Sequence, residues 1–264
     1  MKLPRLQNFL RIARFLQASN HGDVGCAVWM KFRATQFCMA EQYGLIFDVD
    51  GVIADSEAVN AEVSIRVFED LFGVKGVRRE DFDKGLGRGS AEYVMAAARI
   101  HDLALDEQQT AQATAARQDY FITRLNERPL PPFSGVMALF LTALEHPDFA
   151  LAIATSSTRE KSVAVLKSAG IPYEKMVYIT GSDVTHKKPH PELFDKAVEQ
   201  LRIPPACCVV IEDAPNGIEA AKAAGCRCIA VTNSVDAGQL EQADRVVDSL
   251  EEIDLDQIRT LLQG

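Results

Sequence analysis

Basic residues are scarce in this sequence. It contains 28 Lys and Arg against 37 Asp and Glu, which gives a formal net charge of −9 at pH 7. A nucleic-acid-binding domain normally offers an excess of Lys and Arg to the phosphate backbone. The acidic balance therefore argues against a nucleic-acid partner, and any phosphate site in this chain has to be basic only locally. At 264 residues the chain has room for a full α/β core and a smaller second domain.

The sequence also lacks a disulfide framework. Its six cysteines include no C-x-x-C pair, and Cys207, Cys208, Cys226 and Cys228 fall in apolar segments. Buried free cysteine behaves as a small hydrophobe. We therefore interpret these four as packing residues of a protein in a reducing compartment, which favours the cytoplasm. His186 has no partner at metal-ligand spacing, so we do not expect a zinc site there.

Residues 1–40 differ from the rest of the chain. They carry six Lys or Arg and a single acidic residue, and their apolar side chains follow an amphipathic, arginine-bearing pattern. Organelle transit peptides share that pattern. The apolar positions are too interrupted for a membrane span or a secretory signal, so we expect no membrane partner. Met39 stands just before the first apolar segment, and we expect 1–40 to be an extension outside the core, with an organelle-targeting segment as the alternative.

Two carboxylates follow the first apolar segment of the core. Asp48 and Asp50 come directly after the run at 44–47, and Gly51 comes next. A continuous apolar run is typical of a parallel strand buried on both faces, and ligands in open α/β sheets bind just beyond the strands' carboxyl ends. Gly51 lets the chain turn so that both acids face one small volume. Such a pair indicates a divalent cation, a shared proton or separate acid and base roles; an ordinary strand-ending turn is the alternative.

A second apolar segment ends in hydroxyl groups. The run at 149–154 is followed by Thr155, Ser156, Ser157 and Thr158. Hydroxyls and free backbone N–H groups at a strand-to-helix junction form a phosphate cradle. We expect Thr155 to bind a phosphoryl oxygen, with Ser156 beside it, and Ser157 or Thr158 to cap the following helix. Such clusters also cap helices without binding any ligand.

Two further motifs supply charges of both signs. Lys187 and Lys188 lie in a polar loop before an amphipathic run, where one lysine can neutralise a phosphoryl group. Glu212 and Asp213 close a later apolar run and offer oxygen ligands to a hard cation shared with Asp48. A solvated basic loop explains the lysines taken alone, but it does not explain four such motifs together.

The four motifs in this order resemble those of the haloacid dehalogenase superfamily, specifically its phosphatase and phosphomutase branch with a helical cap inserted after the first motif. The matching positions are Asp48 in D-x-D-G-V, Thr155 at a strand end, Lys188 before Pro189, and Glu212-Asp213. The resemblance covers about 43–264 and implies an α/β fold: a Rossmann-like doubly wound parallel sheet core with an inserted α-helical cap. We expect the core to comprise 41–56 and 132–264 and the cap to comprise 57–131.

The resemblance also implies roles for the acidic residues. Asp48 is expected to be the nucleophile that forms an aspartyl-phosphate, and Asp50 to be the general acid and base. A Mg²⁺ cofactor is expected to be held by Asp48, by the backbone carbonyl of Asp50, and by Asp213 with help from Glu212.

The phosphate contacts implied by the resemblance come from three places. Thr155 and Lys188 are expected to hold the equatorial phosphoryl oxygens. Lys187 stands where the family often has glycine, so the choice between the two lysines is open, and we select Lys188. Arg88 lies in the glycine-rich loop at 85–90 and is expected to reach the substrate when the cap closes. A glycine-rich turn with a solvated arginine is the alternative.

The pattern of the whole chain from residue 43 alternates strands with helices, which is typical of a parallel sheet with right-handed crossovers. We predict strands near 44–48, 149–154, 176–180, 207–211 and 227–231, with a short sixth at 245–247. Helical spacing is predicted over 58–72, 90–100 and 107–125. The resemblance implies that the first strand lies in the middle of the sheet.

Several activities are open to such a site. The β-phosphoglucomutases have a histidine four residues after the motif Ser/Thr, where this chain has Asn60, and this favours a phosphatase over the alternative sugar phosphomutase. A non-catalytic phosphate- or metal-binding module would require the loss of a motif residue, and none is missing. We therefore predict a Mg²⁺-dependent phosphatase that acts on a small phosphorylated substrate, in particular a sugar phosphate, with a monomer as the default state.

Overall fold

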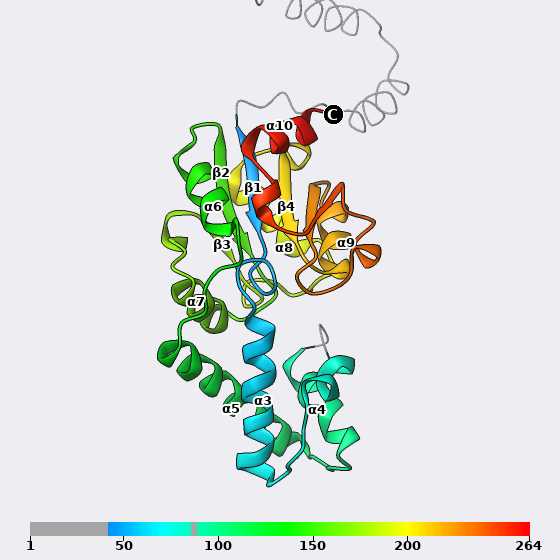
Figure 1. Ribbon diagram of the computed structural model, residues 1–264. Helices are drawn as coiled ribbons and strands as arrows, with labels where there is room; N and C mark the ends of the chain where they lie inside the picture. The colour runs from blue at the N-terminus through cyan, green and yellow to red at the C-terminus, as the bar shows by residue number, and fades with distance from the viewer. Residues whose placement is uncertain (1–41, 86–88) are drawn as a thin grey trace, which may run out of the picture. The chain divides into compact units, whose positions relative to one another are not determined.

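The computed structural model describes residues 42–85 and 89–264, which form a six-stranded parallel sheet with a helical insertion (Figure 1). The strand order is β3-β2-β1-β4-β5-β6, so β1 lies inside the sheet between β2 and β4. This is the predicted Rossmann-like α/β fold, with the first strand in the interior. The strands are β1 Tyr43–Phe47, β2 Phe149–Ala154, β3 Val177–Ile179, β4 Cys208–Glu212, β5 Arg227–Val231 and β6 Arg245–Val247.

Helices pack on the sheet in two groups because the chain reverses direction at β1. Right-handed crossovers toward β3 and toward β6 place their helices on opposite faces. Thus α8 packs on β1, β2 and β3 and contacts α9, which packs on β4 and β5, whereas α6 packs on β2 and contacts η5. In open α/β sheets such a reversal marks the place, beyond the carboxyl ends of the strands, where ligands bind. The core helices are α6 Val136–Glu145, α7 Arg159–Ser168, α8 Glu192–Leu201, α9 Pro215–Ala223, η5 Leu250–Glu252 and α10 Leu255–Gln263.

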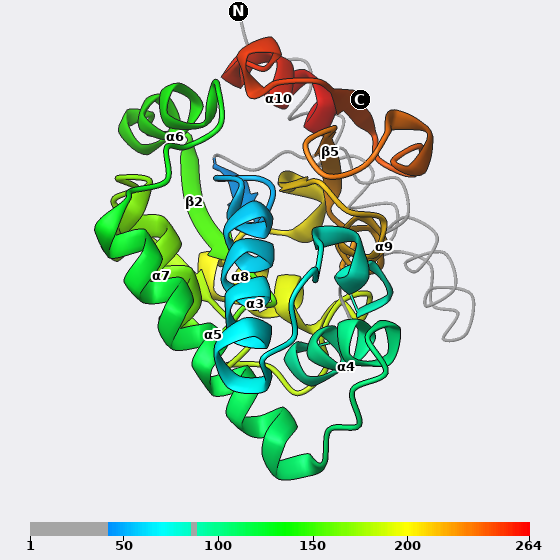
Figure 2. The ribbon, with the colours of Figure 1, turned by 60° about the horizontal axis from the view of Figure 1, so that its bottom comes forward.

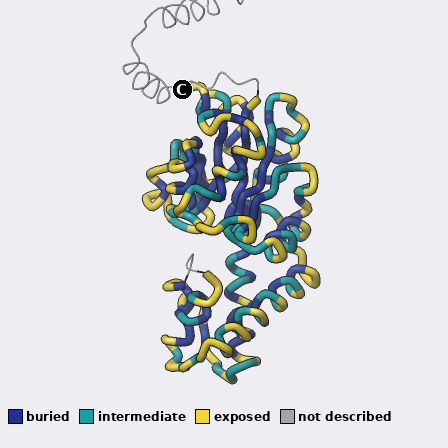
Figure 3. Tube along the Cα trace, turned by 180° about the vertical axis from the view of Figure 1, so that it is seen from behind, coloured by how far each residue is buried: buried dark blue, intermediate teal, exposed yellow. Residues whose placement is uncertain are grey.

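The core of the sheet is apolar on both faces, as the continuous hydrophobic runs predicted. Every residue of β1 is buried, and Ile46 pairs in register with Ala152 of β2 and Val210 of β4. The interior of the sheet is dark blue in Figure 3, whereas the edge strands β3 and β6 are only partly buried. Cys208, Cys226 and Cys228 are free and buried, as expected of packing residues. Cys207 is buried as well, but it is disulfide-bonded, so the prediction of four free packing cysteines is wrong at that position. None of the helices in the described part of the chain is both long and apolar enough to cross a bilayer.

The helical insertion between β1 and α6 has a hydrophobic cluster of its own, separate from the core of the sheet. At its centre Phe82 stacks on Tyr93 with ring centroids 4.8 Å apart, and Phe68 packs edge-on against Phe82. Its long helix α5 lies along α7 of the core (Figure 2). The elements of this cap are α3 Ser56–Phe72, η1 Arg79–Gly85, α4 Ser90–Ile100 and α5 Glu107–Glu127.

The junction between the sheet and the insertion is short. Asp55 caps α3 by accepting a hydrogen bond from the backbone N–H of Ala58 at 3.1 Å, so the helix begins at Ser56, one residue before the predicted limit of the cap. The returning chain meets the outgoing one where Phe133 N–H donates to Ile53 O at 2.8 Å. The first turn of α3 is therefore held close to the carboxyl end of β1.

Candidate active site

The carboxyl ends of three strands bring the predicted site residues to one edge of the sheet. Asp48 directly follows β1, Thr155 directly follows β2, and Glu212 is the last residue of β4. The backbone N–H of Asp48 donates to Ile211 O at 3.1 Å, which extends the pairing of β1 with β4 by one residue. Carboxyl ends of parallel strands share an edge, so these side chains gather at the edge where open α/β sheets bind their ligands.

The acidic centre consists of Asp48, Glu212, Asp213 and one cation, Lys188. Lys188 Nζ donates to Asp48 Oδ1 at 2.6 Å and also contacts Glu212 Oε1. The side chains of Asp48 and Lys188 are each 7% exposed and that of Glu212 is 1% exposed. Burial leaves little solvent to screen these charges. Three buried carboxylates therefore share a single ammonium group.

The excess of carboxylates over cations shifts the pKa values in the acidic centre. Burial raises the pKa of Asp48 to about 7, and the charges of Glu212 and Asp50 add to the rise while Lys188 opposes it. Burial, followed by the charges of Glu212 and Asp48, raises the pKa of Asp213. Oxygen-rich groups with excess negative charge match the ligand preference of Mg²⁺. The donor set of Asp48, Asp213 and Glu212 thus fits a hard divalent cation.

Two glycines make room for these carboxylates. Gly51 has φ +79°, and a Cβ there would lie 1.8 Å from Asp213 Oδ2. A Cβ at Gly217, in the first turn of α9, would lie 1.9 Å from Glu212 Oε1. Any side chain at either position would displace a carboxylate. The sequence predicted a turn at Gly51, and the structure adds the close approach to Asp213.

Ser234 and Asn233 were missed by the sequence reasoning. Ser234 Oγ donates to Asp213 Oδ2, and Asn233 Nδ2 donates to the carbonyl oxygen of Gly51 at 2.8 Å. Both residues follow β5, the strand beside β4. Their position after a strand end was the available signal, because Asp48, Thr155 and Glu212 lie at the corresponding ends of β1, β2 and β4.

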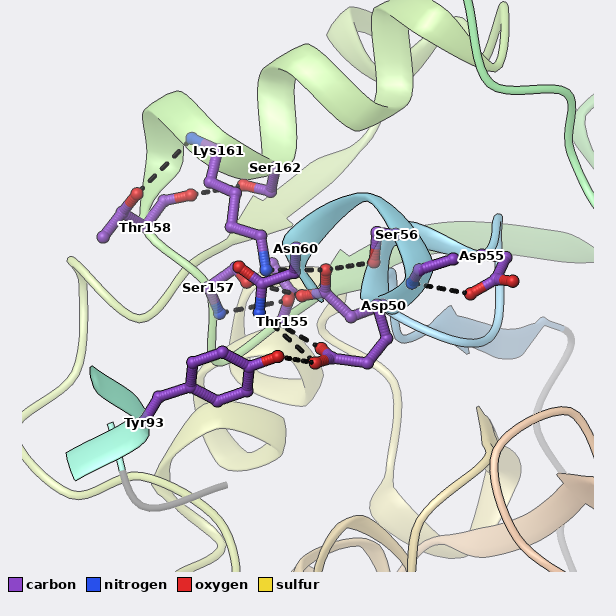
Figure 4. A network of polar contacts seen from close by, with 12 residues as sticks. Asp50, Asp55, Ser56, Asn60, Tyr93, Thr155, Ser157, Thr158, Lys161 and Ser162 are labelled. Carbon is purple, nitrogen blue, oxygen red and sulfur yellow. Dashed lines mark hydrogen bonds and ion pairs between the residues drawn. The ribbon is translucent and has the colours of Figure 1, made fainter. Parts of the chain in front are cut away.

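The Asp50 network consists of Asp50, Ser56, Ser157 and Lys161 (Figure 4). Asp50 Oδ1 accepts from Ser56 Oγ at 2.5 Å and lies 3.2 Å from Lys161 Nζ, while Oδ2 accepts from Ser157 Oγ at 2.5 Å. Burial raises the pKa of Asp50, but Lys161 and the two serine hydroxyls outweigh it, so the pKa lies below its ordinary value. Lys161 is a further residue that sequence reasoning missed.

The hydroxyl segment after β2 divides its work among its members. Thr158 caps α7 by accepting a hydrogen bond from the backbone N–H of Lys161. Of the two predicted capping residues, Thr158 is therefore the cap, and Ser157 instead donates to Asp50. Thr155 is buried, and its Oγ accepts from Ser157 N–H at 3.2 Å. The buried Ser156 Oγ finds no hydrogen-bond partner among the residues that the structure describes. A phosphoryl oxygen is the kind of group that would satisfy it.

The cap cluster consists of Glu57, Asn60, Tyr93 and Arg117. Glu57 accepts from Tyr93 Oη at 2.8 Å and from Asn60 Nδ2 at 3.3 Å. Arg117 Nη2 donates to Asn60 Oδ1 at 2.7 Å, and the guanidinium lies over the Tyr93 ring with 4.4 Å between Cζ and the centroid. Arg117 was not among the predicted site residues, because the sequence does not show in which direction a side chain on α5 points. Both polar ends of Asn60 are engaged within the cap.

Lys188 and Arg88 are the two charged residues that were predicted to contact the phosphoryl group or the substrate. The structure brings Lys188 to the acidic centre, whereas Lys187 is exposed. Arg88 lies outside the described residues, so its predicted contact with substrate stays a prediction.

The loop before α8 contains one more group that the sequence reasoning excluded. His186, His190 and Glu192 place potential metal-ligand atoms within 4.8 Å of one another, so the statement that His186 has no partner is wrong. Glu192 accepts from the backbone N–H groups of Thr185 and His186 and from His186 Nδ1 at 3.0 Å. These contacts give the group a structural explanation, the closure of the loop that carries Lys188.

The chain is similar in sequence to known proteins, of which one is close to it in length and another is much longer. The chain is 31% identical over 212 residues to the putative phosphatase YhcW of Bacillus subtilis. This alignment covers 80% of this chain and 93% of YhcW. It is 32% identical over 204 residues to SUPPRESSOR OF QUENCHING 1, chloroplastic, of Arabidopsis thaliana, but this match spans 75% of the chain and only 19% of that relative.

A solved structure shares the fold across nearly its whole length. CbbY from Rhodobacter sphaeroides, in complex with xylulose-(1,5)bisphosphate, superposes with a TM-score of 0.73 at 27% identity, covering 82% of this chain and 99% of that one. The family model described as haloacid dehalogenase-like hydrolase matches residues 45–231, which run from within β1 to the end of β5 and include all four motifs. The chain therefore belongs to the haloacid dehalogenase-like hydrolase family, and it is an enzyme of the hydrolase class.

Proposed function

We propose that the protein is a Mg²⁺-dependent phosphatase that hydrolyses a small phosphorylated metabolite through an aspartyl-phosphate on Asp48. The acidic centre is the observation that carries this proposal, because it joins a buried carboxylate at a strand end to an ammonium group and to two further carboxylates. The named activity of YhcW, though putative, supports phosphate-ester hydrolysis. The bisphosphate in the CbbY structure supports a sugar phosphate as the substrate class.

In the first step an oxygen of Asp48 bonds to phosphorus as the ester P–O bond breaks. The leaving oxygen takes its proton from Asp50. Asp50 has a lowered pKa without substrate, and a phosphate dianion beside it would raise that pKa and favour the protonated form. Lys188, Thr155 and Ser156 would hold the phosphoryl oxygens, on which negative charge is spread.

In the second step Asp50, now a carboxylate, removes a proton from water. The water oxygen bonds to phosphorus, the P–O bond to Asp48 breaks, and inorganic phosphate leaves. Mg²⁺ bound by Asp48, Asp213, Glu212 and the backbone carbonyl of Asp50 would supply positive charge that offsets the repulsion between the nucleophile and the phosphate.

We propose that 57–131 acts as a cap that opens for the substrate and then excludes water, with Arg88 reaching the substrate on closure. The core would comprise 41–56 and 132–264, and the enzyme would be a monomer without a nucleic-acid partner. A cytoplasmic location is proposed as well. The chloroplastic relative keeps organelle targeting by 1–40 as the alternative.

The test is Mg²⁺-dependent release of phosphate from a panel of sugar phosphates, phosphoglycolate and p-nitrophenyl phosphate, with EDTA as the control. One sugar phosphate is expected to exceed the rest. The panel includes β-glucose 1-phosphate assayed for glucose 6-phosphate. Isomerised product without free phosphate would replace the phosphatase by a mutase, and no turnover of any compound with Mg²⁺ would contradict the proposal.

A further inference from the structure

Lys161 joins the Asp50 network to α7 of the core. It stands three residues after Thr158, the N-cap of α7, and positions i and i+3 of a helix share a face. Its Nζ lies 3.2 Å from Asp50 Oδ1, and the side chains of Lys161 and Asp50 are 21% and 26% exposed. Figure 4 shows the lysine reaching from α7 toward Asp50, Ser157 and Asn60.

The same ammonium group also faces the cap. Its Nζ lies 5.0 Å from the centroid of the Phe121 ring, which is buried on α5. Its charge opposes the rise that burial produces in the pKa of Glu57, a residue in the first turn of α3. Because α5 packs along α7, Lys161 is placed where two cap helices meet the core. One side chain thus touches both parts of the enzyme and Asp50.

The two hydroxyls and the ammonium group constrain Asp50 differently. Ser56 and Ser157 each bond to one carboxylate oxygen, and both hydroxyls can rotate to act as donor or acceptor. Lys161 is only a donor, and its interaction with a carboxylate is charge-assisted and stronger than a neutral hydrogen bond. Of the ion pairs made by the described residues, the one with Lys161 is the pair that fixes the Asp50 carboxyl group.

We propose that Lys161 is a positioning residue that holds Asp50 in place for proton transfer and makes that placement depend on the docked cap. The proposal rests on the proposed function, in which Asp50 is the general acid and base. Loss of the ammonium group would leave the nucleophile and the acidic centre in place. It would misplace the proton donor, so the effect should depend on how much the leaving group needs a proton.

Two aryl phosphates measure that dependence without involving sugar recognition. Phenyl phosphate has a basic leaving group that needs protonation, whereas the leaving group of p-nitrophenyl phosphate departs without a proton. The quantity compared is kcat/KM, because it reports only the steps up to phosphoryl transfer. Lys161→Met is expected to lower kcat/KM for phenyl phosphate by about tenfold or more. The loss of kcat/KM for p-nitrophenyl phosphate should be far smaller. Equal losses on both substrates, or no loss on either, would overturn the proposal.

Three further variants guard the interpretation. Lys167→Met removes an exposed lysine from the same helix and should leave both values unchanged, while Lys161→Arg should restore part of the loss. In an Asp50→Asn background, Lys161→Met should add almost nothing, because the two residues act as one unit. Independent, multiplying losses would show that Lys161 acts on the substrate instead. If the wild-type enzyme released phosphate from none of these aryl phosphates and sugar phosphates, the result would contradict the proposed phosphatase function. It would not bear on the positioning role of Lys161.

Discussion

Asp48 and Asp50 are separated by one residue, and their surroundings push their pKa values in opposite directions. In the acidic centre, burial and the charges of Glu212 and Asp50 raise the pKa of Asp48 to about 7 against the opposing effect of Lys188. In the Asp50 network, burial is outweighed by Lys161 and two serine hydroxyls. The residue type is the same in both. The number of cations and hydrogen-bond donors available to each buried carboxylate decides its charge.

This difference separates the two tasks of the proposed reaction. A group of carboxylates with too little positive charge gains most from a divalent cation. A single carboxylate with its own ammonium group can stay ionised without one, and it can exchange a proton when a substrate changes its surroundings. The acidic centre is therefore suited to nucleophilic attack with a metal, and the Asp50 network to proton transfer.

The largest expected effect is on the nucleophile. Asp48→Asn should lower kcat by at least about 10³-fold, because an amide oxygen cannot form the aspartyl-phosphate. Phosphate release with saturating Mg²⁺ measures this, and the melting temperature reports whether the fold is kept. Asp55→Asn is the matched control, since Asp55 is an exposed helix cap and asparagine caps a helix equally well. Turnover at the wild-type rate in Asp48→Asn would contradict the assignment of Asp48 as the nucleophile, and with it the difference in role between Asp48 and Asp50.

The next effect concerns the single cation of the acidic centre. Lys188→Met should leave the buried carboxylates of Asp48 and Glu212 without their ion-pair partner, which should destabilise the protein by about 3–5 kcal/mol and lower kcat/KM by about 10²-fold. Denaturant unfolding and phosphate release measure the two effects. Lys187→Met removes the neighbouring exposed lysine and should change stability by less than about 0.5 kcal/mol. Similar losses in both variants would mean that Lys187 shares the role.

The smallest expected effect is a pH dependence of stabilisation by Mg²⁺. The raised pKa of Asp48 means that, without a cation, the folded protein keeps a proton that the unfolded chain has lost. Stability in EDTA should therefore contain a contribution that is lost as pH rises from the ordinary carboxyl range to about 7. Mg²⁺ binds the carboxylate form, so the increase in Tm that it causes should grow by a few degrees, on the order of 2–4 °C, over the same window.

Scanning fluorimetry with and without Mg²⁺ at several pH values checks this expectation. Asp213→Asn is the matched variant, because it removes one carboxylate from the acidic centre while keeping its size. That variant should melt higher than the wild type in EDTA and gain less from Mg²⁺. A stabilisation by Mg²⁺ that is independent of pH in both proteins would contradict the assignment of excess charge to the acidic centre.

The strands were the most predictable part of the molecule. The predicted segments at 149–154, 227–231 and 245–247 match β2, β5 and β6 residue for residue. Buried parallel strands need apolar side chains on both faces, so each strand is a continuous run that is visible without knowledge of its partners. The long insertion was visible for a similar reason, because helical spacing repeats within one element.

Within the site, the motif residues were predictable and their supporting residues were not. Asp48, Thr155, Glu212 and Asp213 each follow or end a strand, so a local pattern marks them. Lys161 lies on α7 and reaches Asp50 across more than a hundred residues of sequence. Nothing in the local sequence distinguishes it from other lysines on helices. The contact depends on how α7 packs against α5 of the cap at the carboxyl edge of the sheet.

By itself, the sequence determined the parallel sheet, the helical insertion and the four motifs at strand ends, because each is written in a short stretch of chain with its own periodicity or residue types. The tertiary structure decided that Lys188 and not Lys187 meets Asp48, that Asn60 is held by Glu57 and Arg117, and that Lys161 pairs with Asp50. Charges acquire their partners only when distant segments pack together. Electrostatic energies depend on those distances and on burial, so the protonation of this site is a property of the folded protein.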